Sequence, residues 1–94
     1  SLPLLTVVGF DATTNTNSIF VIWQTPNITS MTQVMYGVDP ANLDHTTVVD
    51  SVPVNVHEIT INGLTSQTRY YLQAVSVDQY GRTVYSEIIS KVTK

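Results

Sequence analysis

The chain has 94 residues, of which 43% are hydrophobic and 12% are charged, and its formal net charge is −3. This length allows one domain with one hydrophobic core. Four cationic side chains cannot form the basic surface that nucleic-acid binding needs, and the absence of cysteine excludes disulfides and cysteine metal ligands. No apolar run approaches the about 20 residues of a membrane-spanning helix, so we expect no membrane insertion.

Alternating apolar residues predict four strands in the first half of the chain. The second strand places Ile19, Val21 and Trp23 on one face, and Pro26 ends it because proline donates no ladder hydrogen bond. The four expected ranges are Leu4 to Phe10, Ser18 to Gln24, Thr32 to Gly37 and an edge strand at His45 to Asp50.

Three more strands are expected after a break at Pro53, with Gly81 supplying a positive φ in the last turn. Their ranges are His57 to Asn62, Arg69 to Asp78 and Thr83 to Thr93. Seven short strands with regular turn signals and no helical periodicity predict an all-β fold. We expect a seven-stranded antiparallel two-sheet Greek-key sandwich.

The segment Gly63-Leu64-Thr65-Ser66-Gln67-Thr68-Arg69-Tyr70 couples a turn to the longest predicted strand. Tyr70 is the first inward residue of that strand. This pattern is typical of a tyrosine corner, in which the phenol satisfies backbone groups of the preceding turn. We therefore expect Trp23, Leu64 and Tyr70 to be structural residues.

The chain resembles a fibronectin type III domain over essentially its whole length. The matching motifs are Ile19-x-Val21-x-Trp23, Gly63-Leu64-x-Ser66-x-Thr68-x-Tyr70, and Gly81 before Ser86. The family usually has a proline at the position of Ser66. The resemblance implies an immunoglobulin-like fold. Nothing at the amino end resembles a signal peptide, and Ser1-Leu2-Pro3 has the character of a linker stub, so we expect residues 1–94 to be a single domain cut from a longer multidomain protein.

The pair of segments Val34-Met35-Tyr36-Gly37 and His57-x-Ile59-x-Ile61 is similar to a bacterial and archaeal branch of that family. The branch includes the sandwich domain that precedes the catalytic domain of purple acid phosphatases, and accessory modules of secreted glycoside hydrolases. In the phosphatases the metal ligands lie in the neighbouring domain, so this resemblance implies no catalytic residue here.

His45 and His57 are the only histidines, and metal binding or acid–base catalysis would require them to converge with carboxylates. His57 and Glu58 are adjacent on one predicted strand and therefore point to opposite faces. We expect a structural or surface role for both histidines. The chain is expected to be no enzyme and to hold no cofactor or metal.

Three aspartates and one asparagine are further candidates. Asp39, Asp44 and Asp50 are five and six residues apart with no glycine among them, unlike a calcium loop, and Asp39 before Pro40 is more simply a turn former. A weak calcium site at these aspartates stays open. Asn27-Ile28-Thr29 satisfies the glycosylation sequon in the loop after the second strand.

Aromatic residues offer a second kind of candidate site. Tyr71, Tyr80 and Tyr85 are the tyrosines available for a sugar-stacking platform, and the simpler interpretation makes Tyr71 and Tyr85 cross-strand partners on the outer faces. The 78–82 hairpin, with Tyr80 and Arg82, is a candidate contact loop because loops on a rigid scaffold often carry binding. It lacks the integrin-binding tripeptide that some members of the resembled family display there.

Phe20 and Ile22 alternate with the inward residues of the second strand, so they are expected on its outward face. Isolated sandwiches usually keep such a face polar. We therefore predict a contact surface, extended by neighbours on the first and fifth strands, that a neighbouring domain covers or, as a second choice, another copy of the chain. The alternative is that both side chains pack beneath a loop or a lysine stem.

These features favour a non-catalytic module of an extracellular or cell-surface protein, which acts as a spacer and packing unit between neighbouring domains of its parent chain. One alternative is a module that binds carbohydrate or another protein. The other is an accessory domain packed against the catalytic domain of a secreted hydrolase. The secreted location is expected from the low charge and the prominence of Ser, Thr and Asn.

Overall fold

The computed structural model describes residues 2–94, and it contains nine strands and no helix in that range. In chain order the strands are β1 (Val8–Thr14), β2 (Ile19–Gln24), β3 (Ser30–Gly37), β4 (His45–Thr46), β5 (Asp50–Val54), β6 (Val56–Ile61), β7 (Arg69–Val77), β8 (Thr83–Tyr85) and β9 (Ile89–Val92).

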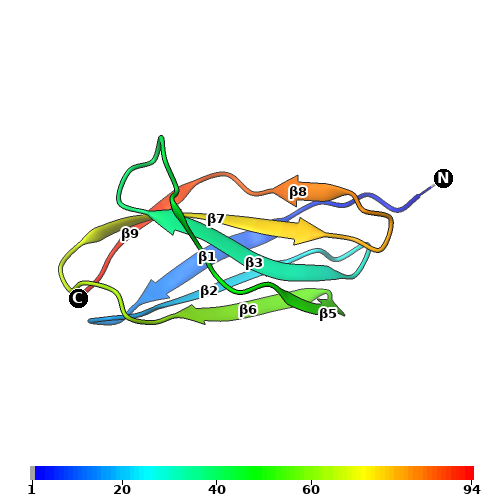
Figure 1. Ribbon diagram of the computed structural model, residues 1–94. Coiled ribbons are helices and arrows are strands. Elements are labelled where there is room, and N and C mark those ends of the chain that lie inside the picture. The colour runs from blue at the N-terminus through cyan, green and yellow to red at the C-terminus, as the bar shows by residue number, and fades with distance from the viewer. Residues whose placement is uncertain (1) are drawn as a thin grey trace.

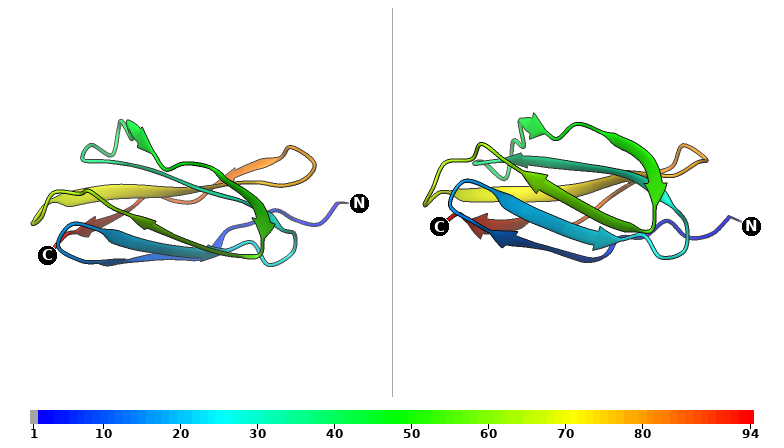
Figure 2. Two further views of the ribbon diagram at one scale, coloured as in Figure 1. Left: turned by 60° about the horizontal axis from the view of Figure 1, so that its bottom comes forward. Right: turned by 90° about the horizontal axis from the view of Figure 1, so that it is seen from below.

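The strands form two antiparallel sheets that pack face to face (Figures 1 and 2). The smaller sheet has the order β1-β2-β6. The larger sheet has the order β4-β3-β7-β8, and β5 pairs with β3 and β9 with β7. The chain passes from the larger sheet to the smaller one through β5 and β6 (Figure 2). The predicted two-sheet antiparallel sandwich is confirmed.

The core lies between the sheets and is supplied by alternate residues of the strands. Ile19, Val21 and Trp23 of β2 are each at most 1% exposed, as the alternation predicted. The larger sheet faces them with Val34 of β3 and Leu72 of β7, both fully buried. One inward face per strand is thus buried, which explains why the alternation in the sequence was informative.

The turn before β7 is a tyrosine corner. The Thr65 N–H donates a hydrogen bond of 2.9 Å to the Tyr70 hydroxyl, and both Leu64 and Tyr70 are buried. The Thr93 hydroxyl donates to the Thr65 carbonyl at 2.6 Å, which ties the last residues of the chain to the same turn. Ser66 stands where a proline is usual, and the corner forms with these hydrogen bonds.

The first strand begins and ends later than predicted, because β1 covers Val8–Thr14 rather than Leu4 to Phe10. Thr13 and Thr14 pair with β2, since their branched side chains suit a pleated strand. A β-bulge at Gly9 and Phe10 interrupts the ladder, and Gly9 has a φ of +66°. The bulge turns Phe10 inward, edge-on to Trp23 at 6.1 Å between ring centroids.

The prediction of one strand from His45 to Asp50 was wrong, because this stretch forms the short β4 and the start of β5. Pro53 was expected to break the chain, but it lies within β5. β5 pairs only with β3 among the described strands, and an edge strand tolerates the missing N–H of a proline.

The last predicted strand, Thr83 to Thr93, is divided into β8 and β9. Tyr85 pairs with Val75 and Ile89 pairs with Leu72. Three residues therefore lie between the paired positions on this segment, but only two lie between them on β7. The one extra residue leaves the ladder near Ser86, whose hydroxyl accepts the Ala74 N–H at 2.8 Å. This interruption and the divided fourth strand explain why nine strands are found over residues 2–94 instead of seven.

The domain is elongated, with principal dimensions of 46 × 23 × 21 Å. The two ends of the chain lie at opposite ends of the long axis (Figure 1). Residues 2–94 include no helix that is long and apolar enough to cross a membrane.

Candidate functional site

The outward side of the smaller sheet carries four large apolar side chains. Phe20 and Ile22 of β2 are 37% and 40% exposed, so their predicted outward orientation is confirmed. Val8 of β1 and Val56 of β6 are 44% and 54% exposed on the same side, because both pair with Gln24 of β2. We call Val8, Phe20, Ile22 and Val56 the outer-face patch.

Two carboxylates flank the outer-face patch. In the strand register, Ile22 lies between Asp11 of β1 and Glu58 of β6. Asp11 forms an ion pair of 3.1 Å with Lys91 of β9. The Ala12 N–H, which donates to the Asp11 carboxylate at 2.8 Å, and then Lys91 hold the pKa of Asp11 below its usual 3.8. The sheet therefore presents an apolar centre with an acidic margin.

The hairpin between β7 and β8 is organised by a buried carboxylate. The Tyr80 and Arg82 N–H groups donate to Asp78 Oδ1 at 2.9 and 3.0 Å, and Arg82 Nε donates to Oδ2 at 2.6 Å. Burial alone would raise the pKa of Asp78, but the hydrogen bonds from Arg82 and Tyr80 and the charge of Arg82 hold it below 3.8. Arg82 also donates to the Pro3 carbonyl at 2.7 Å.

Tyr80 and Arg82 are thus engaged within the hairpin, where the guanidinium carbon lies 5.7 Å from the centre of the Tyr80 ring. Gly81 has the positive φ expected for this turn. The hairpin belongs to the larger sheet, whereas Phe20 and Ile22 lie on the outward side of the smaller sheet. The two candidate contact regions therefore lie on different sheets, and contact with a partner at either one stays a prediction.

His57 has a structural position at one end of the core. Its ring stacks on Trp23 at 4.9 Å between centroids, and it has no exposed surface. The hydroxyl oxygens of Thr25 and Ser30 lie 2.9 and 3.2 Å from Nε2, and that of Thr32 lies 2.7 Å from Nδ1. Burial lowers the pKa of His57 below its ordinary 6.5. Both ring nitrogens are satisfied by buried hydroxyls.

His45 and the three aspartates lie on the surface and do not gather into one site. His45 stacks on Tyr36 at 5.4 Å between ring centroids, and its Nε2 lies 3.6 Å from Asp44 Oδ1. Asp39 accepts the Ala41 N–H and Asp50 accepts the Val52 N–H, which are turn-forming hydrogen bonds. Among the described residues, no three His, Cys, Asp or Glu side chains gather in a way that could hold a metal ion.

The exposed tyrosines do not form a stacked platform. Tyr85 pairs with Val75, and Tyr71 pairs with Gly37 and Ser90, so Tyr71 and Tyr85 are not cross-strand partners of each other. Within residues 2–94 no two tyrosine rings stack. Carbohydrate binding therefore stays a prediction without a platform to support it.

Asn27 is exposed in the loop between β2 and β3. Its position leaves the glycosylation sequon accessible from solvent. Attachment of a glycan at this asparagine stays a prediction.

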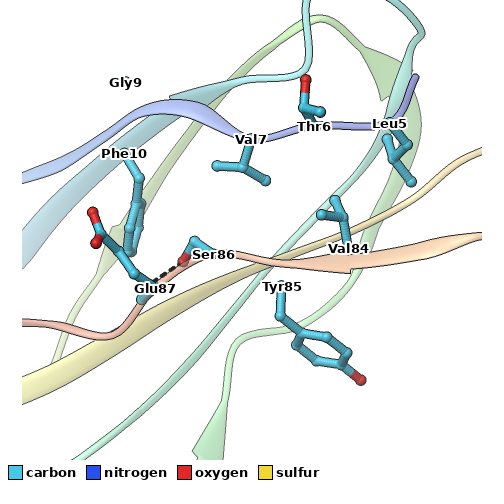
Figure 3. Close-up of a pocket in the computed structure, with 9 residues that line it drawn as sticks. All are labelled: Leu5, Thr6, Val7, Gly9, Phe10, Val84, Tyr85, Ser86 and Glu87. Carbon is cyan, nitrogen blue, oxygen red and sulfur yellow. Dashed lines mark hydrogen bonds between the residues drawn. The ribbon is translucent and has the colours of Figure 1, made fainter. Parts of the chain in front are cut away.

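A groove that the sequence did not predict lies between the N-terminal segment and β8 (Figure 3). Its volume is about 370 Å³. Leu5, Val7 and Val84 point into it, whereas the Tyr85 ring is directed away (Figure 3). The two walls are about 80 positions apart in the sequence, and no local pattern in either segment indicates that they meet.

The two antiparallel sheets, the buried tryptophan and the tyrosine corner define an immunoglobulin-like sandwich of the fibronectin type III kind. Residues 8–93 match the family model described as "Purple acid Phosphatase, N-terminal domain". The chain belongs to the family of purple acid phosphatase N-terminal domains, which are non-catalytic accessory domains. The resemblance based on Val34 to Gly37 and His57 to Ile61 is confirmed. None of the curated proteins that were compared matches the chain.

Proposed function

We propose that this domain is the accessory unit of an extracellular hydrolase and that it packs against a neighbouring catalytic domain through the outer-face patch. The observation that carries the proposal is the exposure of Phe20 and Ile22 at the centre of a sheet face. A sheet face left in water is usually polar, and a larger apolar patch marks an interaction site. The family supplies the kind of neighbour, because its name places such domains before a phosphatase domain.

The elongated shape supports a spacer role beside the packing role. The chain enters at one end of the 46 Å axis and leaves at the other (Figure 1). Segments attached to the two ends are therefore held apart by most of the length of the domain. A rigid sandwich in this position sets both distance and orientation between its neighbours.

The extracellular location is proposed from the surface chemistry. Charged residues make up 12% of the chain, and hydroxyl and amide side chains provide much of its polarity. Cell fractionation of the source organism, with an antibody against the domain, tests this part. Recovery of the protein only from the cytosol would overturn it.

Hydroxyl-radical footprinting tests the packing role, because it labels solvent-exposed side chains. Phe20 and Ile22 should be labelled in the 94-residue chain and protected in the complete gene product. Tyr80 and Tyr85, which are exposed outside the patch, should be labelled in both and serve as matched controls. Equal labelling of Phe20 in both proteins, or a gene that encodes no further domain, would overturn the proposal.

Catalysis is assigned to the neighbouring domain. The Ser30 hydroxyl lies within hydrogen-bond distance of His57, but both residues are buried at one end of the core, so a substrate has no access to this pair. We expect the purified 94-residue chain to show no phosphatase or glycosidase turnover above background with added divalent metal ions. Turnover that survives further purification would contradict this assignment.

A further inference from the structure

A recess interrupts the outer-face patch beside Ile22. It has a volume of about 90 Å³ and is lined by Gly9, Ile22, Trp23, Gln24, Val56 and Glu58. Gly9 belongs to the β-bulge of β1, and the space around its missing side chain is open. The recess is therefore a consequence of the bulge, which places a residue without a side chain where a flat strand would carry one.

The walls of the recess are of two kinds. Ile22 and Val56 provide apolar surface on β2 and β6, and both are partly exposed. Glu58 lies directly opposite Ile22 in the strand register and is the one acidic residue of the lining. A side chain that complements both kinds of wall combines an aliphatic stem with a positively charged end.

Within residues 2–94, no cationic side chain forms an ion pair with Glu58. Three of the four cationic side chains are engaged elsewhere: Lys91 with Asp11, Arg82 with Asp78, and Arg69 with the Ser90 hydroxyl. The carboxylate at the recess is available to a partner.

We propose that the recess receives an arginine side chain from the catalytic domain that packs on the outer-face patch. The methylene stem lies against Ile22 and Val56, and the guanidinium pairs with the Glu58 carboxylate. Arginine is favoured over lysine because its planar fork donates two parallel hydrogen bonds to a carboxylate, and it is enriched in interface cores. This inference rests on the proposed packing function and names the anchor of that contact.

The test uses n-butylguanidinium as a probe of the arginine side chain and n-butanol as an uncharged control. Amide shifts of the ¹⁵N-labelled 94-residue chain are followed by NMR during each titration. We expect n-butylguanidinium to shift the amides of Gly9, Ile22 and Glu58, with n-butanol binding there more weakly. Glu58→Gln should weaken n-butylguanidinium binding about two- to fivefold, to the level of n-butanol.

Glu87→Gln is the matched control, because Glu87 is an exposed carboxylate outside this face and forms no ion pair among the described residues. It should leave the affinity unchanged. Equal affinity of the wild type and Glu58→Gln, or shifts confined to other parts of the chain, would overturn the inference. Concentration-dependent shifts at the same amides without any probe would identify a second copy as the occupant and would also overturn it.

The two proposals fail in different experiments. Protection of Phe20 in the complete gene product without binding of n-butylguanidinium would leave the packing function standing and remove the arginine anchor. Binding that depends on Glu58 supports the anchor directly, since the titration contains no other domain.

Discussion

The two sides of β2 differ sharply although they alternate along six residues. On the inward side, Trp23 stacks on His57, and its Nε1–H donates to the Ser76 hydroxyl at 3.0 Å. On the outward side, Phe20 and Ile22 remain more than one-third exposed. The inward side is buried by partners within the chain, whereas the outward side carries two large apolar side chains that stay partly open to solvent.

This difference separates stability from association. Substitutions on the inward side remove contacts that the folded chain already makes, so they should lower the free energy of unfolding. Substitutions on the outward side remove surface that only a partner would cover. The largest effects are therefore expected at the core, and the smallest at the outer-face patch.

Trp23→Ala should give the largest loss. Removing the indole leaves a cavity and an unstacked His57 ring, and such changes lower the free energy of unfolding by about 3–5 kcal/mol. Urea denaturation followed by far-UV circular dichroism measures the loss. A change within about 0.5 kcal/mol, as at an ordinary surface site, would show that the inward side of β2 is not the stabilising one.

Tyr70→Phe should rank second and should exceed Tyr80→Phe. The first change leaves the Thr65 N–H without its acceptor, at a cost of about 1–3 kcal/mol. The hydroxyl of Tyr80 lies on an exposed turn residue, so its removal should cost less than about 0.5 kcal/mol. Equal denaturation midpoints for the two variants would contradict the structural importance of the tyrosine corner.

The inward side should also make stability depend on pH through His57. Because burial lowers the pKa of His57 below 6.5, the unfolded chain binds this proton at a higher pH than the folded chain. The free energy of unfolding is therefore highest, as far as His57 is concerned, above pH 6.5, and it decreases as the pH falls below 6.5. The pKa values of Asp11 and Asp78 lie below 3.8, so these carboxylates stay ionised while His57 titrates in the unfolded chain near pH 6.5.

Urea midpoints measured between about pH 7.5 and about pH 5 test this prediction. His57→Gln should remove most of the decrease, whereas His45→Gln at an exposed site should retain it. An unchanged midpoint of the wild type across this interval would contradict the prediction.

Phe20→Ser and Ile22→Thr should have the smallest effect on stability. Both side chains are more than one-third exposed, so the free energy of unfolding should change by less than about 0.5 kcal/mol while solubility improves. Denaturation and the concentration at the onset of precipitation provide the two measurements. A loss above about 2 kcal/mol for either variant would show that the outward side is part of the stabilising core.

Strands with one buried face were predictable from the sequence. The alternation in β2 and the pattern from Gly63 to Tyr70 give the correct inward residues, because periodicity of two is a local property. The outward position of Phe20 and Ile22 follows from the same alternation. The sequence therefore predicted two of the four residues of the outer-face patch, and these two lie on its central strand.

The edges and the polar core were not predictable in the same way. Val48 is exposed between β4 and β5, and Pro53 is tolerated inside an edge strand, so no alternation marks this stretch. The hydroxyl partners of His57 come from two other segments of the chain and meet only in the folded sandwich. The recess at Gly9 depends on a bulge whose register is set by pairing with β2.

The stack of Trp23 on His57 makes the protein its own optical indicator. Trp23 is the only tryptophan, so all indole fluorescence comes from this one ring. The His57 ring is stacked on this indole at 4.9 Å between centroids, and a protonated imidazole quenches indole fluorescence more strongly than a neutral one does. Emission intensity at each pH thus reports the charge of a single buried side chain in the intact fold, without any label.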